Sequence, residues 1–359
     1  MDDIFKEILN VLARGERAAL STIVSSKGSL PMSKKAKMLV KQDGKIIGTV
    51  GGGCLEADVW AEAKRVMGEE MPNLQTFILT EKHAGESGLN CGGNVEIFTE
   101  PIMPGRSNEV FEEIVKIRTE DKQAVLATLV SGGRAQKMLV ERDGRVVGSL
   151  GNPVLDNLII QEVEEVIQED LLKVFTGEGE RIFVEAILPE PTLFLFGGGH
   201  VSKAIARVAK TVGFRLVVID DRPAFASLER FPEADEVVVD DFRVIVGRLP
   251  IDESSYLVAV TRGHQWDEQV IEQVVWTKAK YIGMIGSRRK IALMWKRFEE
   301  RGIPRSLLEA VHAPIGIDIH ADTPEEIAVS VVAELIKVRR EKGKPGHVVD
   351  QEPSRAAVA

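Results

Sequence analysis

Residues 192–204 read TLFLFGGGHVSKA: an apolar run, three glycines and the start of a helical pattern. A second apolar run at 214–219 follows that helix and ends in Asp220 and Asp221. This order is typical of a dinucleotide-type βαβ unit, in which helix-start amides bind a phosphate and an acid after the second strand holds a ribose. Ser202 replaces the third glycine of the usual fingerprint. We place in this crevice Gly197, Gly199, His200, Asp220 and Asp221.

Further apolar runs at 236–239, 256–260 and 281–285 alternate with helical patterns, which predicts a doubly wound parallel sheet. Ligands of such sheets bind beyond the carboxyl ends of the strands. The loops after the last two runs therefore add four candidates to the crevice: His264, Ser287, Arg288 and Arg289. The arginines suit a phosphate, although a charged helix start is as often a solvated surface. The histidines lack metal-ligand spacing, so we predict no structural metal.

An internal repeat occupies the first half of the chain. The stretch KMLVKQDGKIIGTVG at 37–51 returns as KMLVERDGRVVGSLG at 137–151. Each copy has apolar runs around an Asp-Gly dipeptide, typical of a β-hairpin, and then a helical pattern and another strand. The predicted organisation is an α+β domain at 1–188 with copies at about 15–103 and 121–188, a stiff linker at 189–192, a Rossmann-like domain at 193–340 and a flexible tail at 341–359.

The differences between the copies locate the chemistry. The two cysteines of the chain, Cys54 and Cys91, both lie in copy one, and the aligned positions of copy two hold no thiol. With no C-x-x-C pair, we expect free thiols. Cys54 follows three glycines at a predicted helix start, where backbone N–H groups favour the thiolate that binds a metal or attacks sulfur. A buried structural cysteine is the alternative. The glycines, which let a large ligand approach the backbone, are Gly51, Gly52 and Gly53.

The charge balance narrows the choice of partners. The 359 residues include 46 Lys and Arg against 55 Asp and Glu, a formal net charge of −9. An acidic chain without a concentrated basic face is unlike proteins that bind nucleic acid or anionic membranes. No apolar run reaches the ~18 residues of a membrane span, and the amino terminus lacks a signal-peptide pattern. We expect a cytoplasmic protein with a small-molecule or protein ligand.

Together these motifs resemble the xanthine dehydrogenase accessory factor family of the XdhC/CoxI type. The motifs that carry the resemblance are residues 51–56 (GGGCLE), 91–93 (CGG), 199–201 (GHV), 218–223 (VIDDRP), 285–290 (IGSRRK) and 323–328 (TPEEIA). His320 stands where we expect the family to favour glycine.

The resemblance implies a cytoplasmic carrier rather than an enzyme, and a homodimer. Such a carrier binds the molybdenum cofactor, molybdopterin or its dinucleotide form, protects it during sulfuration by a cysteine desulfurase, and inserts it into an apo molybdenum hydroxylase. Carried to this chain, the resemblance makes Cys54 the leading contact for molybdenum or transferred sulfur, and Cys91 the second. Two alternatives stay open: an NAD(P)-dependent oxidoreductase with His264 as the nearest proton donor, and a nucleotide-sensing regulatory module. A selenium-related role would leave similar residues.

Overall fold

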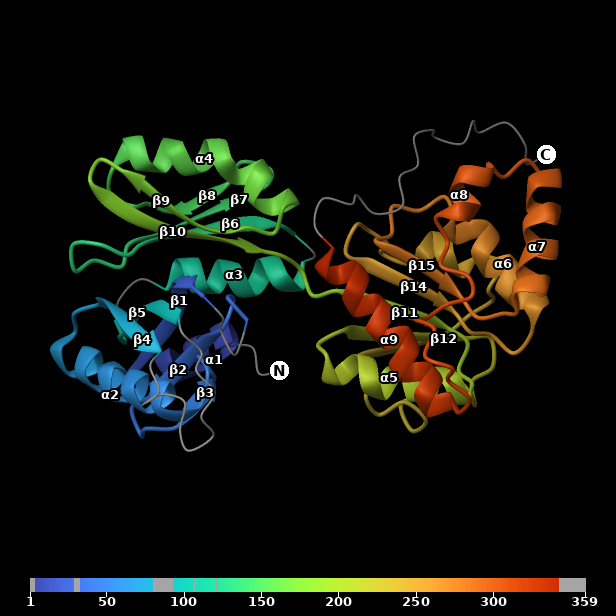
Figure 1. Cartoon of the computed structure of the whole chain (residues 1–359), viewed down its shortest axis with the longest axis horizontal. Helices are drawn as coiled ribbons and strands as arrows, with labels where there is room; N and C mark the ends of the chain where they lie inside the picture. The colour runs from blue at the N-terminus through green and yellow to red at the C-terminus, as the bar shows by residue number, and fades with distance from the viewer. Residues whose placement is uncertain (1–3, 29–32, 80–92, 106–107, 121, 342–359) are drawn as a thin grey trace. The chain divides into compact units, whose positions relative to one another are not determined.

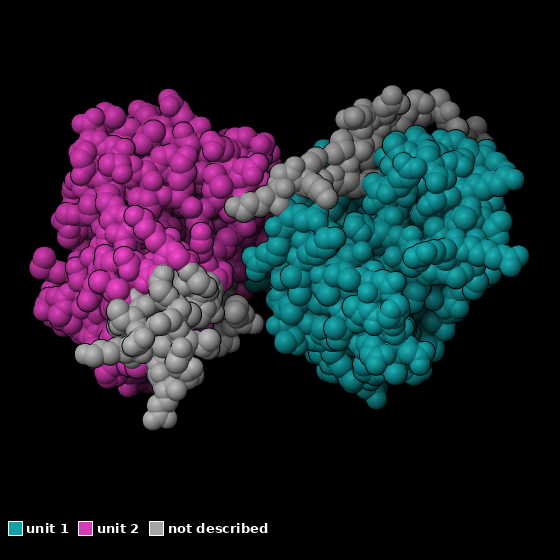
Figure 2. Space-filling view, in the orientation of Figure 1, with its two compact units in different colours: residues 1, 190–359 teal, residues 2–189 magenta. Residues whose placement is uncertain are grey.

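The computed structural model describes residues 4–28, 33–79, 93–105, 108–120 and 122–341 (Figure 1). The chain forms two compact units, residues 2–189 and residues 190–359, which Figure 2 shows in different colours. We call the first the repeat unit and the second the Rossmann unit. Across the described residues, no helix is both long and apolar enough to cross a membrane.

The repeat unit contains the same series of elements twice. Copy one comprises α1 (Ile4–Ala13), β1 (Ala18–Lys27), β2 (Lys37–Lys41), β3 (Ile46–Gly48), α2 (Gly53–Glu69), β4 (Asn73–Leu79) and β5 (Gly93–Ile102). Copy two comprises α3 (Glu109–Thr119), β6 (Ala124–Leu129), β7 (Lys137–Glu141), β8 (Val146–Gly148), α4 (Pro153–Gln168), β9 (Leu172–Gly177) and β10 (Glu180–Ile187). Their sheets have matching antiparallel orders, β3-β2-β1-β5-β4 and β8-β7-β6-β10-β9. Each copy thus begins with a helix upstream of the stretch in which the sequence repeat was found.

The Asp-Gly dipeptides make the predicted hairpins. β2 pairs antiparallel with β3, and β7 with β8. Gly44 has φ 87° and Gly144 has φ 93°, which only glycine adopts without cost. The carboxylate of Asp43 accepts a hydrogen bond from the N–H of Lys45 at 3.0 Å, and the same turn closes copy two. Local turn chemistry therefore fixes the strand register in both copies.

The two copies share one core. α2 covers one face of the copy-one sheet and α4 covers the matching face of the copy-two sheet, while α3 lies between the two sheets (Figure 1). The inner faces and the helices α1 and α3 bury a common apolar cluster, which includes Phe5, Ile8, Leu20, Phe111, Ile114 and Leu126. Burial of such side chains contributes roughly 1.5–3 kcal/mol each. The copies are therefore docked by hydrophobic packing.

The Rossmann unit is a doubly wound parallel sheet. Its elements are β11 (Thr192–Phe196), α5 (His200–Thr211), β12 (Arg215–Asp220), β13 (Glu236–Val239), β14 (Ser255–Ala259), α6 (His264–Val274), β15 (Tyr281–Met284), α7 (Arg288–Glu300), α8 (Arg305–Glu309) and α9 (Pro324–Arg340). The strand order is β13-β12-β11-β14-β15, and every neighbouring pair is parallel. Apolar clusters cover both faces of the sheet. The predicted fold class, an α+β repeat region followed by a Rossmann-like sheet, is confirmed.

Candidate functional site

Cys54 is the second residue of α2, and its thiol is free and exposed. The exposure contradicts the alternative of a buried structural cysteine. The three residues before it have positive φ: 146° at Gly51, 72° at Gly52 and 63° at Gly53. Gly52 is the N-cap, and no side chain accepts a hydrogen bond from the first turn. The first N–H groups of α2 therefore lie open beside the thiol.

The matching helix start in copy two is closed. Asn152 caps α4, because its side-chain oxygen accepts a hydrogen bond from the N–H of Val154 at 2.9 Å. Pro153 occupies the first turn, where it removes another N–H donor. Asn152 has φ −142°, ordinary extended backbone. The two helices start at equivalent places in one fold, yet only copy one presents free donors and a thiol.

Cys91, the second predicted thiol, lies outside the described residues. In the ranges that the structure describes, no three His, Cys, Asp or Glu side chains gather as a metal site. Cys54 is therefore placed by its helix and not by a cluster of ligands.

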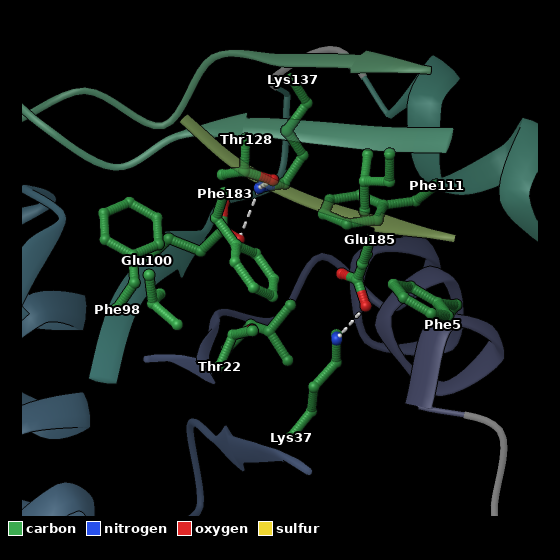
Figure 3. Close-up of a pocket in the computed structure, with 13 residues that line it drawn as sticks. Phe5, Thr22, Lys37, Phe98, Glu100, Phe111, Thr128, Lys137, Phe183 and Glu185 are labelled. Carbon is green, nitrogen blue, oxygen red and sulfur yellow. Dashed lines mark hydrogen bonds and ion pairs between the residues drawn. The ribbon is translucent and has the colours of Figure 1, made fainter. Parts of the chain in front are cut away.

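A small, mostly apolar cavity with four charged side chains in its wall lies between the two copies (Figure 3). Lys37 of copy one pairs with Glu185 of copy two, and Lys137 of copy two pairs with Glu100 of copy one, each with 2.6 Å between Nζ and the carboxylate. Each of these four side chains is less than a tenth exposed. The free volume of about 10 Å³ holds no more than about one water molecule. Because the charges neutralise one another in so small a space, this cavity is no cofactor site.

The sequence analysis missed these four residues. The lysines open the repeated KMLV motif, and the glutamates occupy matching positions at the ends of β5 and β10. A charged residue that recurs within an otherwise apolar repeat was a usable signal. No sequence signal pointed to the partner of each lysine, because that partner lies in the other copy.

The Rossmann unit brings three helix starts to one edge of its sheet. Gly199, Gly263 and Ser287 are the N-caps of α5, α6 and α7, which follow β11, β14 and β15. Three predicted crevice residues, His200, His264 and Arg288, begin these helices. They and Arg289 are exposed. The strands are parallel, so the predicted residues of these loops lie at the same carboxyl edge of the sheet.

The electrostatics of Asp267 show how close two of these loops are. Asp267 lies in the first turn of α6, and burial raises the pKa of its carboxyl group. Hydrogen bonds from Thr261 and the nearby charges of His264 and Lys290 oppose part of that rise in pKa. Because Lys290 belongs to α7, the starts of α6 and α7 face a common region.

The three glycines after β11 have different tasks. Gly197 has φ 110°, and a Cβ there would lie 2.5 Å from the carbonyl oxygen of Val260. A Cβ on Gly198 would lie 2.1 Å from the carbonyl oxygen of Phe225. A Cβ on Gly199 would meet nothing within 4 Å. Internal packing therefore requires the first two glycines, and the third leaves open space at the start of α5.

Asp220 is hydrogen-bonded to the glycine turn. Its side chain is 1% exposed and accepts hydrogen bonds from the N–H of Gly198 at 2.8 Å and from Arg222. Arg222 donates its backbone N–H at 3.0 Å, Nε at 2.8 Å and Nη2 at 3.0 Å. Both carboxylate oxygens are thus occupied within the protein, and Asp221 is the other acid that was predicted to contact a ribose at the end of β12.

Asp221 also has a partner, an arginine in the loop between β14 and α6. Nη1 and Nη2 of Arg262 donate to the two carboxylate oxygens of Asp221, the second at 2.7 Å. These hydrogen bonds hold the pKa of Asp221 below its ordinary value. The guanidinium lies over the ring of Trp266 at 4.4 Å, a cation–π contact. Arg262 was not among the predicted residues, although its place directly after a buried strand was a signal.

Two buried polar atoms beside the glycine turn have no partner among the described residues. Arg230 donates from Nε to the carbonyl oxygen of Gly198 at 2.8 Å, while its Nη2 is left without an acceptor. The hydroxyl of Ser202, in the first turn of α5, is likewise unpaired. Such unpaired buried polar atoms are rare and costly in folded proteins.

Comparison with known proteins agrees with this two-part architecture. The family model of the XdhC Rossmann domain matches residues 193–335. The model of the XdhC and CoxI family matches residues 11–77 and 117–175, one segment in each copy. The protein is thus of the class that joins a duplicated α+β unit to a Rossmann unit. It belongs to the XdhC and CoxI family.

Named relatives and a solved structure share most of the chain. A Bacillus subtilis (strain 168) protein, named as a probable subunit of xanthine dehydrogenase, is 28% identical over 330 residues, which cover 90% of this chain and 94% of that protein. The Escherichia coli (strain K12) protein named molybdenum cofactor insertion chaperone PaoD is 24% identical over 342 residues, 94% of this chain and 88% of that protein. A crystal structure from Bacillus halodurans, described as a xanthine dehydrogenase, has a TM-score of 0.77 at 25% identity and covers 94% of this chain and 95% of its own.

Proposed function

We propose that this protein is an accessory carrier that binds the molybdenum cofactor and inserts it into a molybdenum hydroxylase of the xanthine dehydrogenase type. One observation carries the proposal: the exposed thiol of Cys54 lies at a helix start without a side-chain cap, whereas the matching helix start in copy two is capped and has no thiol. Membership of the XdhC and CoxI family and the name of the relative PaoD support it.

The residues present fit such a cargo. Molybdenum is a soft metal for which a thiolate is a suitable ligand, and Cys54 offers one at the surface. The open N–H groups of α2 suit an anionic group held close to that thiol. In the Rossmann unit, the open space at Gly199 suits a phosphate group of a nucleotide-type ligand.

In this proposal each residue has a limited task. The cargo supplies the molybdenum centre that the hydroxylase later uses. Cys54 holds the metal or its transferred sulfur, and Gly51 to Gly53 let the cargo approach the backbone. In the Rossmann unit, the starts of α5, α6 and α7 bind a phosphate-bearing ligand through backbone N–H groups, with Arg288 and Arg289 as the charged partners. The partners are an apo hydroxylase and a cysteine desulfurase, the carrier is a cytoplasmic homodimer, and Cys91 is the second candidate thiol.

The proposal is tested on the cysteine. The full-length Cys54→Ala protein and the parent are purified from a molybdenum-replete host, and bound molybdenum and pterin fluorescence are measured with the activation of an apo hydroxylase. We expect Cys54→Ala to lose about tenfold or more in cofactor content and in activation, as loss of a metal contact typically does. Val154→Ala, at the matching place in copy two, is the control and keeps both. A Cys54→Ala protein that binds and delivers as well as the parent removes the thiol from the function.

An NAD(P)-dependent oxidoreductase remains the alternative, because the parallel sheet and glycine turn suit a dinucleotide. Oxidation of NAD(P)H by the purified protein in the presence of small carbonyl compounds would favour it over the carrier. Binding of the nucleotide without turnover would favour a sensing role.

A further inference from the structure

We propose that Arg262 is a phosphate receptor of the Rossmann crevice, and that Asp221 occupies it as an internal competitor until a ligand phosphate takes its place. The inference rests on the proposed function only in that the ligand carries a phosphate or pyrophosphate. It assigns a binding role to an arginine outside the predicted crevice set, and it reverses the role of Asp221 from ribose acceptor to competitor.

The position of the ion pair follows from the sheet order. β11 lies between β12 and β14, as Figure 1 also shows. Asp221 directly follows β12, and Arg262 is the third residue after β14. An ion pair between them therefore joins the two strands that flank β11, at the edge where β11 runs into the glycine turn. That is where doubly wound sheets bind the phosphates of a nucleotide.

The chemistry of Arg262 suits that position. Its planar guanidinium binds the carboxylate of Asp221 with two nitrogen atoms, and the same fork binds a phosphate. The ring of Trp266, at 4.4 Å, holds the guanidinium in place when its partner changes. The carboxylate of Asp221 thus occupies the position on Arg262 that a ligand phosphate would take.

The pair is open enough for exchange. The side chain of Arg262 is 32% exposed and that of Asp221 is 22% exposed, so water and small anions reach both. A partly exposed ion pair of this kind contributes little to stability. Replacement of Asp221 by a ligand phosphate at Arg262 therefore costs little free energy.

The neighbouring arginine, Arg222, does not compete with Arg262 for the ligand phosphate. Arg222 approaches Asp221 to 3.8 Å, but its guanidinium already binds the buried carboxylate of Asp220. Removing the charge of Asp221 therefore leaves Arg262 as the newly unpaired cation of this cluster. The competitor role and the ribose role of Asp221 predict opposite effects on ligand binding.

The experiment uses the full-length protein and four variants: Asp221→Asn, Arg262→Gln, the double variant and Glu309→Gln. Binding of inorganic pyrophosphate, ADP and CDP is measured by calorimetry at low ionic strength. We expect Asp221→Asn to bind pyrophosphate a few-fold more tightly, since a partly exposed ion pair competes only weakly, and Arg262→Gln about tenfold more weakly, since a hydrogen bond to a charged group is worth about that much. The double variant should behave as Arg262→Gln. Glu309→Gln removes the same charge from another carboxylate–arginine pair, on α8, and should change nothing.

Each contrary result has one meaning. Weaker nucleotide binding by Asp221→Asn shows that Asp221 contacts the ligand directly, and it overturns the inference. If no probe binds the parent or Asp221→Asn while circular dichroism shows both folded, Arg262 is not a phosphate receptor. Bound molybdenum and pterin are measured on the same preparations. Tighter pyrophosphate binding by Asp221→Asn with no cofactor in any preparation would retain the receptor and remove the carrier function.

Discussion

The starts of α2 and α4 occupy equivalent places in two copies of one fold, yet they are built differently. α4 has an asparagine cap and a proline in its first turn, while α2 has three glycines with positive φ and no side-chain cap. A side-chain cap typically stabilises a helix by about 1 kcal/mol. Copy two shows that the fold accepts a capped helix here. The glycines of copy one are therefore not required by the fold, and they leave donors and a thiol available to a ligand.

The largest expected effect tests whether the two buried ion pairs between the copies contribute equally to stability. Glu100→Gln in copy one and Glu185→Gln in copy two each leave a buried lysine without its ion-pair partner, which we expect to lower the free energy of unfolding by about 3 kcal/mol in each case. Urea unfolding measures both. The double variant Glu100→Gln with Lys137→Met should recover most of the loss. A large loss at only one of the two glutamates would break the equivalence.

The next effect concerns the two helix starts themselves. Asn152→Ala removes the cap of α4 and should lower the free energy of unfolding by about 1 kcal/mol. Gly52→Asn, at the matching position of α2, should also lower it, by about 1–3 kcal/mol, because φ 72° with ψ 175° is a backbone region that only glycine adopts without strain. Thermal unfolding compares the pair. A Gly52→Asn variant as stable as the parent would show that the start of α2 does not depend on the glycine conformation.

The smallest effect depends on pH. Glu96 and Arg181 occupy matching positions in β5 and β10 and pair with each other through two hydrogen bonds of 2.9 and 2.8 Å. Arg181 lowers the pKa of Glu96 from 4.5 to about 2. The pair therefore stabilises the folded state fully above about pH 4.5, and this contribution disappears as the pH falls toward 2. Since both side chains are partly exposed, we expect less than about 1 kcal/mol.

Arg181→Gln is the variant that measures this contribution. Its free energy of unfolding should fall less than that of the parent between pH 4.5 and pH 2, while Arg134→Gln, on the neighbouring surface pair with Glu180, should change the acid profile less, because the hydroxyl of Ser131 is the main cause of the lowered pKa of Glu180. Identical acid profiles for the parent and Arg181→Gln would show that the hydrogen bonds across the copies contribute nothing.

Much of the fold was predictable because its signals are local. The Asp-Gly turns fixed both hairpins, and the glycine run after 192–196 fixed the first βαβ unit. The repeat also made Cys54 informative, because the sequence supplies its own comparison at Val154. Local pattern and tertiary structure agree at these places, so little had to be known about distant contacts.

The partners of the charged residues were not predictable. Asp220 has the sequence position of a ribose acceptor, but in the structure it accepts hydrogen bonds from Gly198 and Arg222 instead. Arg262 meets an acid 41 residues earlier in the chain, and Lys37 meets a glutamate 148 residues later. Such pairings depend on how strands are ordered and copies docked, and no short-range pattern records them.

The pair formed by Glu96 and Arg181 has one more consequence. When equivalent positions of two repeats touch each other, they lie on the pseudo-twofold axis that relates those repeats. In an assembly of two identical halves, the same residue would have to face itself there, glutamate against glutamate or arginine against arginine. Attraction at such a point is available only to halves that are encoded separately within one polypeptide. The covalent joining of the copies thus permits opposite charges on the axis, and with them a contact that neither half could make with its own duplicate.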